Sequence, residues 1–129
     1  MTYEEIRDYL NHKNPFPNKL GVVITEIREG YATAEVPVQD YMTNGASSVH
    51  GGMLFTLCDT TCGAAAAVDT SFYYLRPALH CSKLRAVAKE VKHGKRIMVF
   101  DLEVFDDADT LLCKGTFSMM QLKFPIVNE

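Results

Sequence analysis

The chain has 129 residues, 47% of them hydrophobic, which suits a single domain (residues 1–129) with a substantial core. The formal net charge is −3, from 13 basic and 16 acidic side chains, and this balance excludes a large basic field for nucleic acid or an anionic membrane. Met1–Leu10 is polar and acidic, unlike a signal peptide, and no apolar run approaches the roughly 20 residues of a membrane span, so we expect a cytoplasmic protein.

The N-terminal third predicts a helix and then a β-hairpin. Thr2 and Glu5 fit a capping box, and apolar residues on one helical face follow until about Lys13. Asn14–Pro17 holds two prolines and predicts a loop or a boundary between elements. Branched residues and then strict alternation predict two strands joined at the turn signal Glu29–Gly30: Leu20–Arg28 and Tyr31–Val38.

The middle of the chain predicts one buried helix. Gln39–Ser48 is polar and predicts an irregular loop, whereas His50–Ala67 has almost no polar face. A helix that is apolar nearly all round is a buried helix. The glycines Gly51 and Gly52 open it and allow close backbone contact near its N-terminus.

The remainder predicts strands joined by short turns, which form an antiparallel sheet. The predicted strands are Asp69–Tyr74, Cys81–Lys92, Arg96–Phe105 and Leu111–Leu122. A sheet wrapped around one apolar helix is an α+β architecture. Such a sheet leaves edges and a face to cover, so we expect pairing with a second copy of the chain.

The four cysteines predict neither a metal site nor a disulfide framework. They form no CxxC pair and no Cys/His group with zinc-finger spacing. We interpret them as reduced, mostly buried thiols: Cys58, Cys62, Cys81 and Cys113.

Asp59 is the polar exception in the predicted apolar helix. A carboxylate there loses hydration unless it is paired or belongs to a site. Burial would raise its pKa towards neutrality, which suits a general base. A helix aspartate that reaches solvent, or that accepts from a neighbouring backbone N–H, explains the same residue equally well.

The residues that lead into this helix favour the catalytic interpretation. Asn44, His50 and Gly51 precede or open it, and a helix N-terminus carries unpaired N–H groups and partial positive charge. Such a terminus can hold the developing oxyanion of acyl transfer. An asparagine on the preceding loop could position a water molecule.

The run from Asn44 to Asp59 resembles the signature of hotdog-fold thioesterases of the phenylacetic-acid-degradation (PaaI-like) type. That signature is an Asn, a His-Gly-Gly six residues on, and an Asp nine residues after the His, as in Asn44, His50 and Asp59. Tyr74–Ala78 and Lys92–Arg96 also match phrases common in the family. The resemblance extends over most of the chain and implies a hotdog fold, an antiparallel sheet wrapped around one long buried central helix.

The resemblance also implies an activity, hydrolysis of an acyl-CoA thioester, and a role for each motif residue. The Gly51 N–H would polarise the carbonyl, Asp59 would act as general base or nucleophile, and Asn44 would orient the water or the leaving thiolate. His50 would support the loop. The Asp usually faces the partner's Asn and Gly, which implies a homodimer, or a dimer of dimers, with shared active sites. No metal or other cofactor is implied.

The segment after the helix departs from the family pattern. Asp59 to Tyr74 is only 15 residues, shorter than the family leads us to expect. A Ser or Thr often stands seven residues before this Tyr, where this chain has Ala67. Thr70 or Ser71 could replace that hydroxyl if the strand is shifted.

Coenzyme A carries phosphates, so cationic anchors are expected. The candidates are Arg76, Lys92, Lys95 and Arg96. Apolar residues that could line an acyl pocket at a dimer interface are Met53, Phe55, Phe72 and Tyr73. Solvated surface charge and ordinary core packing explain the same residues equally well.

Two other functions remain open on the same fold. One is a non-catalytic acyl-thioester binding protein, because the same fold can carry different functions. The other is an enoyl-thioester hydratase or dehydratase, which needs a His and a carboxylate placed differently. The spacing of Asn44, Gly51 and Asp59 argues against the hydratase. The presence of Asp59 ranks the binding protein below hydrolysis, although the short connection after the helix keeps that alternative open.

Overall fold

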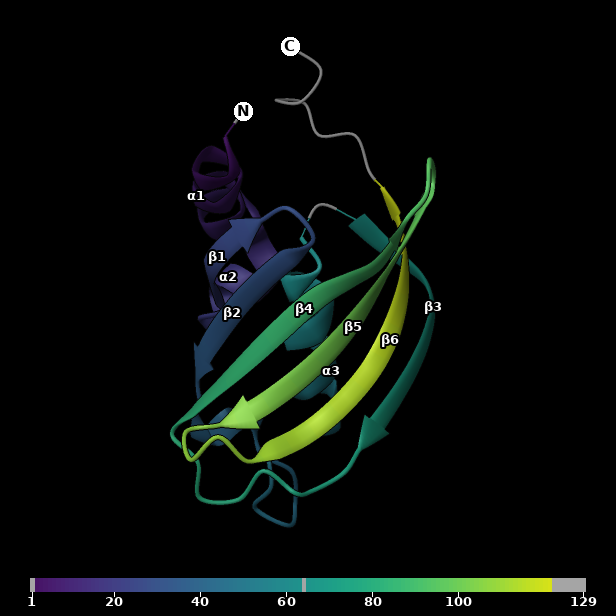
Figure 1. The fold of residues 1–129 in the computed structure, drawn as a ribbon. Helices are drawn as coiled ribbons and strands as arrows, with labels where there is room; N and C mark the ends of the chain where they lie inside the picture. The colour runs from purple at the N-terminus through teal and green to yellow at the C-terminus, as the bar shows by residue number, and fades with distance from the viewer. Residues whose placement is uncertain (1, 64, 122–129) are drawn as a thin grey trace.

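A computed structural model describes residues 2–63 and 65–121, which form one curved antiparallel sheet around a central helix (Figure 1). The six strands lie in the order β1-β2-β4-β5-β6-β3, so β1 and β3 are the edges. The strands are β1 Val23–Arg28, β2 Tyr31–Pro37, β3 Ala65–Tyr74, β4 Lys83–His93, β5 Ile97–Asp106 and β6 Leu111–Gln121. The helices are α1 Tyr3–Lys13, α2 Pro15–Leu20 and α3 Gly51–Thr61, with a 3₁₀ turn at Asp40–Met42. This is the predicted α+β hotdog architecture.

The N-terminal helix α1 begins at the predicted capping box. The Thr2 hydroxyl accepts from the Glu5 N–H at 3.1 Å, and the Glu5 carboxylate accepts from the Thr2 N–H at 2.7 Å. The helix is tied to the edge strand because the Asn11 side chain donates to the Ile24 carbonyl and accepts from the Ile24 N–H, both at 2.9 Å. The helix prediction for this segment is confirmed, and α1 covers one end of the sheet's concave face (Figure 1).

Asn14 is the boundary between α1 and α2, in line with one of the two alternatives predicted for Asn14–Pro17, whereas Pro15–Pro17 lie in α2 and not in a loop. A proline in the first helical turn needs no hydrogen-bond partner for its missing N–H, and its fixed φ suits the helix. Gly21, with φ of 88°, ends the helix, and the first strand therefore starts at Val23 rather than Leu20.

The alternation predicted for the central strands is confirmed by burial. Ala34 and Val36 of β2 face inward, as do alternate residues of the next two strands: Leu84, Ala86, Ala88, Met98, Phe100, Leu102 and Val104. The last predicted strand is confirmed as far as Gln121, and Leu122 lies outside the described residues.

The central helix is shorter than predicted. It ends at Thr61, Gly63 has φ of 78°, and β3 already runs from Ala65, so the prediction of a helix as far as Ala67 is wrong. A short apolar alanine run is compatible with a buried helix and with a strand, and a left-handed glycine is a common helix stop. No helix in the described ranges is long and apolar enough to cross a membrane.

Candidate active site

The N-terminus of α3 presents one open backbone donor. The His50 ring caps the helix, its Nδ1 accepting from the Gly52 N–H at 2.8 Å, and the His50 carbonyl accepts from the Met53 N–H at 2.9 Å. The Gly51 N–H makes no hydrogen bond to any described residue. This N–H lies at the positive end of the helix dipole and is therefore available to bind an incoming hydrogen-bond acceptor.

Tyr74, at the end of β3, holds the Gly51 peptide in place. Its hydroxyl donates to the Gly51 carbonyl at 3.0 Å. A Cβ on residue 51 would lie 3.1 Å from the Tyr74 ring, so the ring lies directly over the glycine. The sequence analysis named no role for Tyr74, although its place in a family phrase was a signal.

Asn44 and Gly51 are brought together in one cavity. The Asn44 side-chain oxygen accepts from the Ala46 and Ser48 N–H groups at 2.9 and 3.2 Å, which leaves its NH₂ group as a donor. A cavity of ≈ 290 Å³ is lined by both residues together with Tyr74 and Arg76. The first motif residue and the helix start therefore share one small depression.

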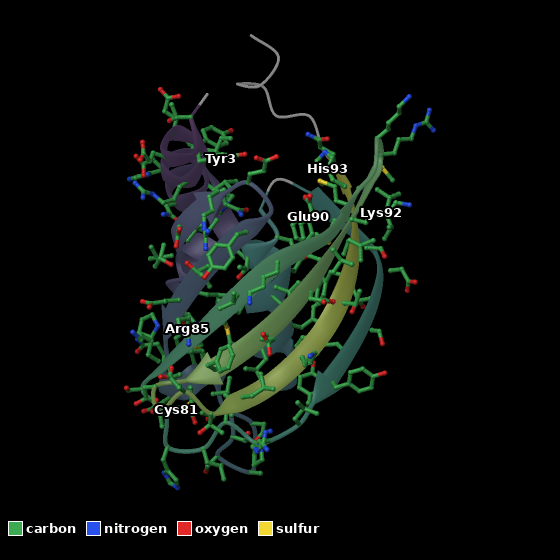
Figure 2. The ribbon with its side chains drawn as sticks, in the orientation of Figure 1. Tyr3, Cys81, Arg85, Glu90, Lys92 and His93 are labelled. Carbon is green, nitrogen blue, oxygen red and sulfur yellow. The ribbon has the colours of Figure 1, made fainter. Side chains whose placement is uncertain are left out.

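The four predicted cationic anchors fall into two places. Arg76 lies at the Gly51 cavity, where its Nη1 donates to the Leu111 carbonyl at 2.8 Å. The other three are exposed at the turn between β4 and β5: Lys92, Lys95 and Arg96. Figure 2 shows Lys92 and His93 at the end of the sheet opposite Cys81, and the loop before α3 lies at the Cys81 end (Figure 1). In a single chain the turn cluster is therefore far from Gly51.

Asp59 is half-buried in a different cavity. That cavity, of ≈ 380 Å³, lies between α3 and the segment α1–α2, and its lining includes Lys13, Phe55 and Thr56. No ion pair or hydrogen bond joins the Asp59 carboxylate to a described residue. Burial raises the pKa of Asp59 above its ordinary value, because the ionised form loses hydration without gaining a partner.

Gly51 and Asp59 cannot meet one carbonyl group within the same chain. Eight residues of α3 separate them, about 12 Å along a helix axis. They also open into separate cavities. A general base must lie within hydrogen-bond reach of the proton that it removes. One chain thus supplies both halves of a site, but in different places.

The predicted acyl-pocket residues also lie in different places and do not line one common cavity in the described part of a single chain. Phe55 lines the Asp59 cavity and packs against Phe72, with ring centroids 5.6 Å apart. Met53 is buried at a neighbouring cavity that includes His50. Tyr73 is 62% exposed and alternates with Phe72, so it points to the other face of the sheet.

The predicted replacement hydroxyls lie after a register shift in β3. A bulge between Ala67 and Asp69 displaces the strand against β6. Thr70 is half-buried and, by alternation, shares the face of Phe72, whereas Ser71 is exposed on the opposite face. Of the two, Thr70 is the one on the helix side of the sheet.

The comparisons with known proteins agree with this fold. The Thioesterase superfamily matches residues 46–113, more than half of the chain. A putative esterase of Archaeoglobus fulgidus is 33% identical over 132 residues, covering 95% of this chain and 86% of that protein. The acyl-coenzyme A thioesterase PaaI of Escherichia coli is 37% identical over 93 residues, 66% of each. The solved structure of the E. coli PaaI protein superposes with a TM-score of 0.87 at 25% identity over 94% of both chains.

The chain therefore belongs to the thioesterase superfamily. Within it, the protein is a hotdog-fold thioesterase of the PaaI-like type.

Proposed function

We propose that the protein hydrolyses an acyl-CoA thioester to a free acid and coenzyme A, with Asp59 as the catalytic carboxylate. The observation that carries this proposal is Asp59 itself, a half-buried carboxylate without a partner among the described residues, lining a cavity. The family supports thioester hydrolysis, and the name of the E. coli relative supports coenzyme A as the carrier.

In the proposed reaction Asp59 takes a proton from water, and the resulting hydroxide adds to the thioester carbonyl. The oxyanion that develops accepts a hydrogen bond from the open Gly51 N–H, assisted by the α3 dipole. The carbon–sulfur bond then breaks and the proton passes to the departing thiolate. The Asn44 NH₂ group is free to bind the water or the sulfur. His50 is engaged with Gly52 rather than with a carboxylate, which favours hydrolysis over hydratase chemistry.

The site is proposed to form between two copies of the chain, with Asp59 of one facing Gly51 and Asn44 of the other. The separation of these residues along α3 supports this arrangement. The edge strand β3 offers a place for pairing, since its outer backbone groups have no strand beside them among the described residues. Exposed apolar side chains lie on the same strand, Val68 and Tyr73 among them.

Antiparallel pairing of two β3 strands would also bring the cationic groups together. The partner's strands would run in the opposite direction, so its β4–β5 turn would lie at the end of the continuous sheet where this chain has Gly51 and Arg76. We therefore propose Arg76 of one subunit, with Lys92, Lys95 and Arg96 of the other, as anchors for the phosphates of coenzyme A.

Thiol release from a panel of aromatic, short and long acyl-CoA substrates tests the function. We expect the wild type to hydrolyse at least one of them and Asp59→Asn to lose on the order of 100-fold or more of that rate while remaining folded. An inert wild type, or an equally active Asp59→Asn, would overturn the proposal in favour of acyl-thioester binding or lyase chemistry.

Complementation tests the shared site. Asp59→Asn and Gly51→Pro each remove one half of the site, the second because proline has no N–H. Mixed dimers of the two inactive variants contain one intact site only if Asp59 and Gly51 act from different subunits. We expect activity to reappear on mixing after mild dissociation; no recovery in confirmed mixed dimers would place both residues in one subunit.

A further inference from the structure

A second cavity, the inner cavity, lies beside the one at Asp59. It has a volume of ≈ 180 Å³ and is lined by α1, the C-terminal end of α3 and the inner face of the sheet. Ile6 and Leu10 come from α1, Ala32 from β2, Cys62 follows α3, and Phe100 comes from β5. Tyr3 and Glu90 also line it, and Figure 2 shows Tyr3 on α1 and Glu90 across from it on the sheet.

This cavity has the character of a hydrocarbon site. Most of its lining side chains are apolar, and its charged groups are Arg28 and Glu90. Apolar cavities tend to stay dry and to accept apolar ligands. Ligand sites are likewise lined mainly by apolar side chains with a few polar groups.

The two cavities adjoin at Leu10 and Gly63. Both residues line both spaces. No described group outside the neighbouring residues lies within 4 Å of the position that a Cβ on Gly63 would take, so the glycine leaves space at this boundary. Cys62, which lines the inner cavity, directly follows α3 and is three residues beyond Asp59.

We propose that the inner cavity receives the far end of a straight, medium-length acyl chain whose thioester lies at Asp59, so that Ile6 and Ala32 determine acyl-chain length. The proposal rests on the proposed thioesterase function and extends it to a substrate class. In this proposal a flexible chain passes between Leu10 and Gly63 and fills both spaces, whereas a rigid aromatic acyl group fills only the outer one.

Filling the inner cavity from two walls tests the proposal. Ala32→Leu and Ile6→Phe add bulk inside it, and Val23→Phe adds bulk at an exposed position on β1 that lines neither cavity. We expect both filling variants to lower kcat/KM for decanoyl-CoA by about tenfold or more, with acetyl-CoA unchanged within about twofold. The Val23→Phe control should resemble the wild type, and Ile6→Ala should extend the preference to dodecanoyl-CoA. Melting temperatures confirm that each variant is folded.

Calorimetric binding of two thioethers that cannot be hydrolysed separates this proposal from the hydrolase proposal. S-decyl-coenzyme A should bind wild type about tenfold or more tightly than S-ethyl-coenzyme A, and Ala32→Leu should abolish that difference. If the wild type binds in this way but hydrolyses no substrate, the acyl-chain cavity proposal is supported and the hydrolase proposal is overturned. If the filling variants keep the preference for the longer chain, or lose activity equally on all chain lengths, the cavity proposal is overturned.

Discussion

Asp59 lies at a half-buried position that disfavours the ionised form of its carboxyl group. Burial raises the pKa of the carboxyl in the folded chain above its value in the unfolded chain. The folded state consequently binds the proton more readily, and stability falls as the pH rises from the unfolded value through the raised folded value. At neutral pH the ionised Asp59 costs the fold stability that a neutral residue of the same shape would not.

Asp59→Asn should therefore separate activity from stability. We expect a melting temperature at pH 7 equal to or higher than that of the wild type, and a difference that shrinks as the pH falls through the raised pKa of the wild-type carboxyl. The wild-type kcat/KM should fall on acidification at a pH above the ordinary aspartate range. Thermal melts and pH–rate profiles measure both; a clear loss of stability at pH 7 would contradict the expected cost of the buried charge.

Gly51 contributes its N–H rather than its small size to the proposed chemistry. We expect Gly51→Pro to lower kcat by about 100-fold or more, in line with the loss of one oxyanion donor. Proline is tolerated at the first helical position, so α3 should persist. Gly51→Ala is the matched control, since its Cβ meets the same Tyr74 ring but the N–H stays. Steady-state kinetics decide: equal losses in the two variants would assign the effect to crowding.

At the scale of the elements, Gly115 of β6 allows β3 to lie where it does. A Cβ there would be 2.6 Å from the Phe72 ring and 2.8 Å from the Ser71 carbonyl oxygen. Phe72 in turn packs against Phe55 beside the Asp59 cavity. The missing side chain on β6 therefore allows the Phe72 ring of the neighbouring strand β3 to pack beside the Asp59 cavity.

Gly115→Ala should destabilise the protein by roughly 1–3 kcal/mol, the usual cost of overpacking. Gly45→Ala is the control, because no described group lies within 4 Å of its Cβ position, and it should change stability by no more than about 0.5 kcal/mol. Chemical denaturation with urea measures both. Equal stability of the two variants would show that β3 moves aside at no cost.

The boundary between α3 and β3 could not be predicted from the hydrophobic pattern of the sequence. The capped helix α1 and the strands with strict alternation were predictable because their periods are distinct. An apolar alanine run has no such period, and only its pairing with β6 makes it a strand. Similarly, the prolines that predicted a loop occupy the first turn of α2, where proline is favoured.

At the scale of the whole molecule, activity should depend on pairing at the β3 edge. We expect Val68→Lys to shift the protein from dimer to monomer and to reduce activity in proportion, because two lysines would approach one another across the proposed interface. Val23→Lys, at an exposed position on the opposite edge strand β1, should leave both unchanged. Light scattering after size-exclusion chromatography gives the mass; an active monomeric Val68→Lys would refute the shared site.

The sequence by itself determined the motif spacing, the inward face of the central strands and the anomaly of Asp59 in an apolar helix. These follow from local period and composition, which a single chain carries in full. Only the tertiary structure decided that Tyr74 covers Gly51, that Asn44 joins Gly51 while Asp59 opens into another cavity, and that Tyr73 points away from Phe55. Each of these depends on which distant residues the sheet brings beside the helix, and register and packing between distant segments leave no local pattern in the sequence.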